Sequence, residues 1–279
     1  MDIPFVKFAL PVAVLYLFYW ALIVNPWVDE SAASSGTQTA NGLSADAVRD
    51  LVDQSKKLLQ EKKYEQALPL MLRVHKAYPE SHIYIEHLAT IYAALGRFGE
   101  EAQMWEKFLQ YAPMPAEGCP QIGQAYEKQN KLVEAEKAFE RCYIIEPNSD
   151  NILFYAHAVE MKGDYKKAAA LYEQGVKRSP NYGDISVGLA RVQMFTGQSA
   201  KAKERVLAVL KRSPDNVDAL LVAGMACTRT GDFALARKYL EHGLKLSPSY
   251  RDLQQAMAHL RASSRPPKQA LALPPGAKP

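Results

Sequence analysis

Histidine is the side chain best suited to acid–base catalysis or metal binding near neutral pH, and the six histidines of this chain are scattered. His82 and His87 lie closest together, but a separation of five places them on different sides of a helix. The sequence contains no glycine-rich phosphate loop, no Gly-x-Ser-x-Gly elbow and no His-Glu-x-x-His motif. We therefore expect a protein that is not an enzyme, with no catalytic residues, no metal site and no cofactor.

The three cysteines could instead bind a metal or form disulfides. Cys119, Cys142 and Cys227 lie 23 and 85 residues apart, which fits neither a Cys-x-x-Cys motif nor a framework of paired cysteines. We interpret them as small residues of the core. The alternative is a bridge between Cys119 and Cys142.

Charge and composition limit the classes of partner. Lysine and arginine number 34 against 30 aspartates and glutamates, a net charge of +4, and the two signs are mixed throughout the chain. No basic stripe of the kind that follows a phosphate backbone is visible, so nucleic acid is not an expected partner. Hydrophobic residues make up 48% of the chain, enough to bury a core.

The first thirty residues contain the longest apolar run. Residues 8–24 carry no charge, and residues 5–25 together are long enough to cross a bilayer. The ten Leu, Ile, Val and Phe residues within 8–24 favour insertion by roughly 3 to 6 kcal/mol. We expect a transmembrane signal anchor over residues 1–28. The alternative, a cleaved signal peptide, has only a weak cleavage site at Ser31-Ala32-Ala33, behind the bulky Trp20 and Trp27.

Flanking charges predict how this anchor is oriented. Lys7 precedes the apolar run, whereas Asp29 and Glu30 follow it and the next basic residue is Arg49. The positive-inside rule places the N-terminus in the cytoplasm. The rest of the chain is then extracytoplasmic, tethered to the inner membrane and facing the periplasm of a bacterium. Polar residues 29–43 read as a flexible linker, and proline-rich residues 264–279 as a disordered tail.

Between these segments the sequence repeats with a period of 34. TGQSAKAKERVLAVLKRSP at 196–214 and TGDFALARKYLEHGLKLSP at 230–248 share Gly, Ala and Pro at equal offsets. Six such units are legible. Apolar residues recur at three- and four-residue steps on both sides of the glycine or its substitute, so each unit is predicted to be a helical hairpin. Small residues twelve positions before each alanine, such as Gly123 and Gly224, are expected to face that alanine where the helices cross.

The unit IGQAYEKQNKLVEAEKAFERCYIIEP, residues 122–147, resembles the tetratricopeptide repeat (TPR) family. It matches that family's skeleton at six positions: Ile122, Gly123, Tyr126, Ala135, Phe139 and Pro147. The resemblance implies an all-α, right-handed α-solenoid of about six TPR hairpins over residues 44–263, closed by a capping helix at 249–263. It also implies a concave face, lined by the first helix of each hairpin, that binds peptides.

The face of each first helix turned away from its own hairpin partner supplies the candidate groove residues. In the C-terminal half these are apolar or basic: Leu153, His157, Val187, Arg191, Met194, Leu221, Met225 and Arg229. Such a surface suits a protein segment that is amphipathic and carries acidic residues. The alternative is that the methionines and aliphatic residues pack between neighbouring hairpins. Some family members clamp a C-terminal carboxylate with basic residues, but here acids occupy the starts of the first helices: Glu117, Asp150, Asp184 and Asp218.

These observations together favour a membrane-tethered scaffold for protein–protein interaction. Its groove would recruit a partner segment during assembly or biogenesis of an envelope complex. The alternative is a cytoplasm-facing membrane receptor or co-chaperone with the reverse topology.

Overall fold

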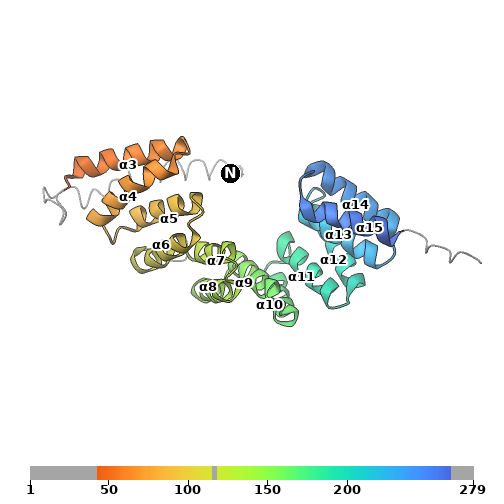
Figure 1. The fold of residues 1–279 in the computed structure, drawn as a ribbon. Coiled ribbons are helices and arrows are strands. Elements are labelled where there is room, and N and C mark those ends of the chain that lie inside the picture. The colour runs from red at the N-terminus through yellow and green to blue at the C-terminus, as the bar shows by residue number, and fades with distance from the viewer. Residues whose placement is uncertain (1–42, 115–117, 265–279) are drawn as a thin grey trace, which may run out of the picture. The chain divides into compact units, whose positions relative to one another are not determined.

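A computed structural model describes residues 43–114 and 118–264, shown as a coloured ribbon in Figure 1. Over these residues the chain is entirely helical, with thirteen helices and no strand. The expected membrane anchor, most of the linker, Glu117 and nearly all of the proline-rich tail lie outside the described residues. Within the described ranges, each helix is too short or too polar to cross a membrane.

The chain divides into two compact units at Gly96. In the first unit α4 packs against both α3 and α5. Its helices are α3 (Ala45–Gln60), α4 (Tyr64–Ala77) and α5 (His82–Ala94).

The second unit contains ten described helices, each packed against the next along the chain. They are α6 (Phe98–Tyr111), α7 (Cys119–Lys128), α8 (Leu132–Ile145), α9 (Ser149–Met161), α10 (Tyr165–Arg178), α11 (Gly183–Phe195), α12 (Ser199–Arg212), α13 (Val217–Arg229), α14 (Phe233–Leu246) and α15 (Arg251–Ser263). Helices α9, α11, α13 and α15 also pack successively against one another. We call α7, α9, α11 and α13 the first helices, and α8, α10, α12 and α14 the second helices.

The turns inside the hairpins explain the repeat. Positive φ angles occur at Gly96, Gly163, Gly197 and Gly231, between 70° and 84°, and at Lys62 and Asn130, both 58°. These six positions are 33 or 34 residues apart, so each period contains one left-handed turn residue. Glycine adopts this conformation without the steric cost that a Cβ imposes, and asparagine tolerates it. Lys62 and Asn130 are the substitutes for glycine that the repeat required.

The helix crossings differ from the expectation in one respect. A Cβ on Gly123 would lie 2.4 Å from the ring of Phe139, and one on Gly224 would lie 2.4 Å from the side chain of Leu240. Phe139 and Leu240 belong to the second helix of the same hairpin. At these two positions the side chain nearest to the glycine is therefore a large one, rather than the alanine expected there. Each glycine instead makes room for a large, fully buried side chain, which fills the crossing.

The cysteines also depart from the expectation of three unpaired core residues. Cys119 and Cys142 form a disulfide with a Cα–Cα distance of 5.5 Å, whereas Cys227 is free and buried. Cys119 begins α7, and Cys142 lies in α8. The two are eleven and twelve residues from Asn130, the turn residue between these helices. In two antiparallel helices, residues at similar distances from the connecting turn lie side by side. Spacing rules for short cysteine motifs therefore do not predict this disulfide.

Candidate functional site

The eight predicted groove residues lie on three consecutive first helices, α9, α11 and α13, but differ in exposure. Val187 and Met194 are each only 3% exposed and belong to a buried cluster around α11 to α13. Five are partly buried: Leu153, His157, Arg191, Leu221 and Met225. Arg229 is exposed. For Val187 and Met194 the burial favours the alternative interpretation, packing between hairpins, because α11 is enclosed by α9 and α13.

Arg191 takes part in a buried ion pair. Its Nε lies 2.5 Å from Oε1 of Glu160, and its Nη2 donates to Oε2 at 2.9 Å. The hydroxyl of Tyr172 donates to the same Oε2 at 2.9 Å. Glu160 is 7% exposed. Burial tends to lower the pKa of Arg191, but its hydrogen bonds and attraction to Glu160 outweigh this and raise it, so the guanidinium stays charged.

The two other polar candidates also contact the preceding first helix. Nδ1 of His157 lies 3.6 Å from Oε1 of Glu127 on α7. Arg229 donates from Nη1 to the backbone carbonyl of Met194 at 2.7 Å, and its guanidinium lies 5.7 Å from the ring centroid of Phe195. Each basic candidate therefore connects its own first helix to the preceding one, as Arg191 does through Glu160.

The acids at the starts of the first helices form a second series of contacts. Tyr182 donates its hydroxyl hydrogen bond to Asp150, and the hydroxyl of Tyr250 donates to Asp218 at 2.8 Å. Burial, together with this bond to Asp218, raises the pKa of Tyr250 to about 12. Asn216 donates to Asp184 at 3.2 Å. These carboxylates accept hydrogen bonds from the next repeat, in addition to the favourable position at a helix N-terminus.

What the first helices leave available to a partner is mainly apolar. Leu153, Leu221 and Met225 are partly buried, each packed at the edge of a buried cluster. Arg229 and the exposed ring of Phe195 lie at the C-terminal ends of α13 and α11. We call these five residues the first-helix surface. Over the described part of the chain, no cluster of three His, Cys, Asp or Glu residues could hold a metal ion.

Sequence reasoning missed other contacts between repeats. Glu136 on α8 is 9% exposed and pairs with Lys162 and with Lys167, the latter at 2.7 Å. Glu101 on α6 is 4% exposed and accepts from Lys128 at 3.0 Å. These pairs could have been sought in the sequence as acidic and basic residues separated by 26 to 31 positions, slightly less than one repeat period.

Comparison with known proteins supports the repeat assignment. Residues 116–149, 161–211 and 187–251 match models described as tetratricopeptide repeat. These parts of the chain are TPR repeats. No curated protein sequence matches this chain significantly.

Several solved structures share the fold. PilW, described as a widely conserved type IV pilus biogenesis factor, is 18% identical with a TM-score of 0.57, covering 75% of this chain and 98% of PilW. The pilF protein of Pseudomonas aeruginosa is 16% identical with a TM-score of 0.56, covering 77% and 98%. A TPR protein of Parabacteroides merdae is 15% identical with a TM-score of 0.59, covering 77% and 84%. At these identities the similarity establishes the fold alone.

Proposed function

We propose that this protein is a membrane-tethered scaffold whose first-helix surface binds a segment of a partner protein in the assembly or biogenesis of an envelope complex. The observation that carries the proposal is the stack of TPR first helices, which leaves Leu153, Leu221 and Met225 partly accessible and Arg229 exposed on the same helix as Leu221 and Met225. Apolar side chains flanked by a cation suit an amphipathic segment with an acidic residue. PilW, a structural neighbour, provides a precedent for a TPR fold in pilus biogenesis.

A photo-crosslinking experiment in native membranes tests the binding surface. A photoreactive amino acid replaces Met225 in the full chain, and a matched control replaces the exposed Lys238 on α14. We expect a crosslinked protein from position 225 that is absent from position 238 and is identified by mass spectrometry. Arg229→Glu should then weaken the crosslink, because it places a like charge against the acidic residue of the segment. Equal crosslinking at both positions would contradict binding at the first-helix surface.

An extracytoplasmic location is part of the proposal. Disulfides persist in oxidising compartments and are rare in the cytosol, so the Cys119–Cys142 bridge supports this location. The charges around residues 5–25 support the same orientation. An alkaline phosphatase fusion after residue 265 should be active. An inactive fusion, together with an active cytoplasmic reporter at the same site, would favour the cytoplasm-facing receptor or co-chaperone.

The disulfide gives an independent check on location. Cells are quenched with a thiol-alkylating reagent, and the full chain is then analysed by mass spectrometry with and without reduction. Cys119 and Cys142 should be protected until they are reduced. A bridge that closes this 23-residue separation stabilises the fold by about 3 kcal/mol in the loop-entropy account, so reduction should also lower the melting temperature. Free thiols at both positions in cells would argue against an oxidising compartment.

A further inference from the structure

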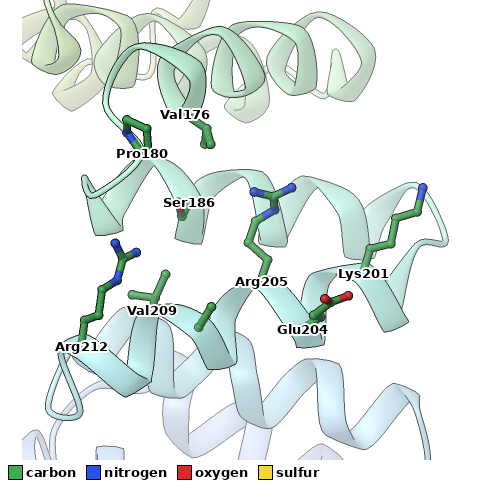
Figure 2. A pocket seen from close by; sticks show the side chains of 9 residues that line it. Val176, Pro180, Ser186, Lys201, Glu204, Arg205, Val209 and Arg212 are labelled. Atoms are coloured by element: carbon green, nitrogen blue, oxygen red, sulfur yellow. The ribbon is translucent and has the colours of Figure 1, made fainter.

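An open cleft of about 500 Å³ lies between α10 and α12, away from the first-helix surface. Figure 2 shows it from close by, with Val176 and Pro180 on one side and the charged side chains of α12 on the other. This volume falls within the range of sites that bind small molecules or short segments. The cleft shares no residue with the first-helix surface.

Three cations line the cleft along one side of α12. Lys201, Arg205 and Arg212 are separated by four and seven residues, so they recur on one face of the helix, about 6 Å and about 10 Å apart along its axis. Figure 2 shows the three side chains projecting from α12 in the same general direction. Glu204 also lines the cleft, so the lining carries two net positive charges.

The partners of these cations within the chain are neutral. Lys201 donates to Gln198 at 3.2 Å, Arg205 to Gln193 at 3.3 Å, and Arg212 to Asn181 at 2.7 Å. Over the described residues, none of the three forms a salt bridge.

Three other cations of the same unit are neutralised by carboxylates. Glu136 pairs with Lys167, Glu160 pairs with Arg191, and Asp232 pairs with Lys203. Lys203 lies on α12 itself, between Lys201 and Arg205 in the sequence. Over the described residues, the three cations of the cleft have no such carboxylate partner, so their charge is available to a ligand that enters the cleft.

The TPR fold does not require cations at these positions. One period later, on α14, the equivalent residues are Leu235, Tyr239 and Leu246. The hairpin of α13 and α14 thus folds with uncharged side chains where α12 presents its cations. Folding of the hairpin therefore does not explain the three cations, whereas an interaction with another molecule would.

We propose that this cleft binds an extended acidic segment of a partner protein. In an extended segment, every second side chain points the same way at about 6.6 Å intervals, close to the axial spacing of Lys201 and Arg205. Carboxylates on that face would pair with the cations, and arginine can hold a carboxylate through two hydrogen bonds. The alternate apolar side chains would point to the opposite side of the cleft and meet Val176 and Pro180. A recess with an apolar wall suits such a segment better than the headgroups of a bilayer or free phosphate.

Fluorescence anisotropy on the full chain in detergent tests this site. The probe is a fluorescein-labelled peptide of alternating glutamate and small apolar residues, Glu-Val-Glu-Ala-Glu-Val-Glu-Ala. Arg205→Gln with Arg212→Gln should weaken binding at least tenfold. The matched control, Arg237→Gln with Lys238→Gln, removes the same charge from exposed positions of α14 and should change binding less than twofold. Equal weakening in both would overturn the proposal, because net charge alone would then explain the binding.

A second variant tests the site without removing a hydrogen bond. Ala208 is exposed, lines the cleft and lies three residues after Arg205 and four before Arg212. In Ala208→Glu, the introduced carboxylate can pair with both arginines on the helix, so the fold should be retained while the cleft is occupied. Probe binding should fall at least tenfold, with unchanged circular dichroism. The matched control is Ala234→Glu on α14, which should bind as the wild type does; equal loss in it would overturn the proposal.

Competitors distinguish the chemical sources of negative charge. The same probe with glutamine in place of glutamate should not bind. Inorganic phosphate at millimolar concentration and vesicles containing phosphatidylglycerol should displace the acidic probe poorly. If the wild type bound these vesicles but not the probe, and Arg205→Gln with Arg212→Gln abolished vesicle binding, the cleft would be a membrane contact and the proposal would fail. Because the first-helix surface is unchanged in every variant, failure here leaves the proposed function standing.

Discussion

Removing the guanidinium of Arg191 should destabilise the stacked repeats substantially. Glu160 is 7% exposed in the wild type, and in Arg191→Met its carboxylate would keep the hydroxyl of Tyr172, at 2.9 Å, as its hydrogen-bond donor. Breaking a buried ion pair by removing one partner costs about 3 to 5 kcal/mol. The side chain of Arg191 is itself 31% exposed, so water can partly reach the site. We therefore expect a loss of about 3 kcal/mol in the free energy of unfolding.

Urea unfolding of a fragment spanning residues 43–264, followed by circular dichroism, measures this loss. The double variant Glu160→Gln with Arg191→Met removes both charges, and it should recover to within about 1 kcal/mol of the wild type. Arg229→Met is the matched control, because that arginine is exposed and contacts a neutral carbonyl and a ring; it should cost less than about 1 kcal/mol.

Two results would refute the reasoning. Arg191→Met could cost no more than Arg229→Met, or the double variant could be no more stable than the single one. The expected result has a consequence for binding experiments. A charge reversal at Arg191 would confound weaker partner binding with weaker folding, so Arg229 is the better position for testing the first-helix surface.

Three further predictions concern stability. The pKa of His87 is lowered from 6.5 to about 4, mainly by burial and secondly by the positive charge of Lys56. Between these pH values the unfolded chain binds more protons than the folded chain does. The free energy of unfolding should therefore fall by about 3 kcal/mol as the pH drops from about 6.5 to about 4. His87→Gln should flatten this dependence in pH-dependent thermal melts, and an unchanged slope would assign it to other groups. Gly197→Ala should lower stability by about 1 kcal/mol, because φ is +80° and nothing lies within 4 Å of the added Cβ. Lys62→Gly should raise stability by a few tenths to about 1 kcal/mol, because glycine adopts a φ of 58° without steric cost. Urea unfolding measures both variants, and the same direction of change for Gly197→Ala and Lys62→Gly would contradict the argument from the turn.

The repeat was predictable because local chemistry sets it. A left-handed residue between two helices recurs once per period, and the glycines at 163, 197 and 231 mark it directly. Apolar residues at helical spacing then identify the two helices on either side. Lys62 and Asn130 occupy the same kind of position without being glycine, so glycine alone does not mark the turn in every unit.

The candidate site was predictable only in part, because exposure depends on neighbours distant in sequence. Helical spacing placed Val187 and Met194 on the outward face of α11, but α9 and α13 enclose that helix, so both are buried. Arg191 was expected to contact a partner protein, but its guanidinium forms an ion pair with Glu160 in the preceding repeat. Periodicity within one helix contains no information on how closely the adjacent helices approach.

The sequence by itself determined the helical hairpins, their period and the apolar run at residues 5–25, because these follow from turn chemistry and from the spacing of apolar residues. Only the tertiary structure decided which charges are neutralised. Acidic and basic residues are mixed along the chain, yet packing pairs Lys203 with Asp232 and leaves the three cations of the α10–α12 cleft with neutral amide partners. The pairing joins groups about one repeat apart, and their distance is set by how the hairpins stack rather than by their order in the chain.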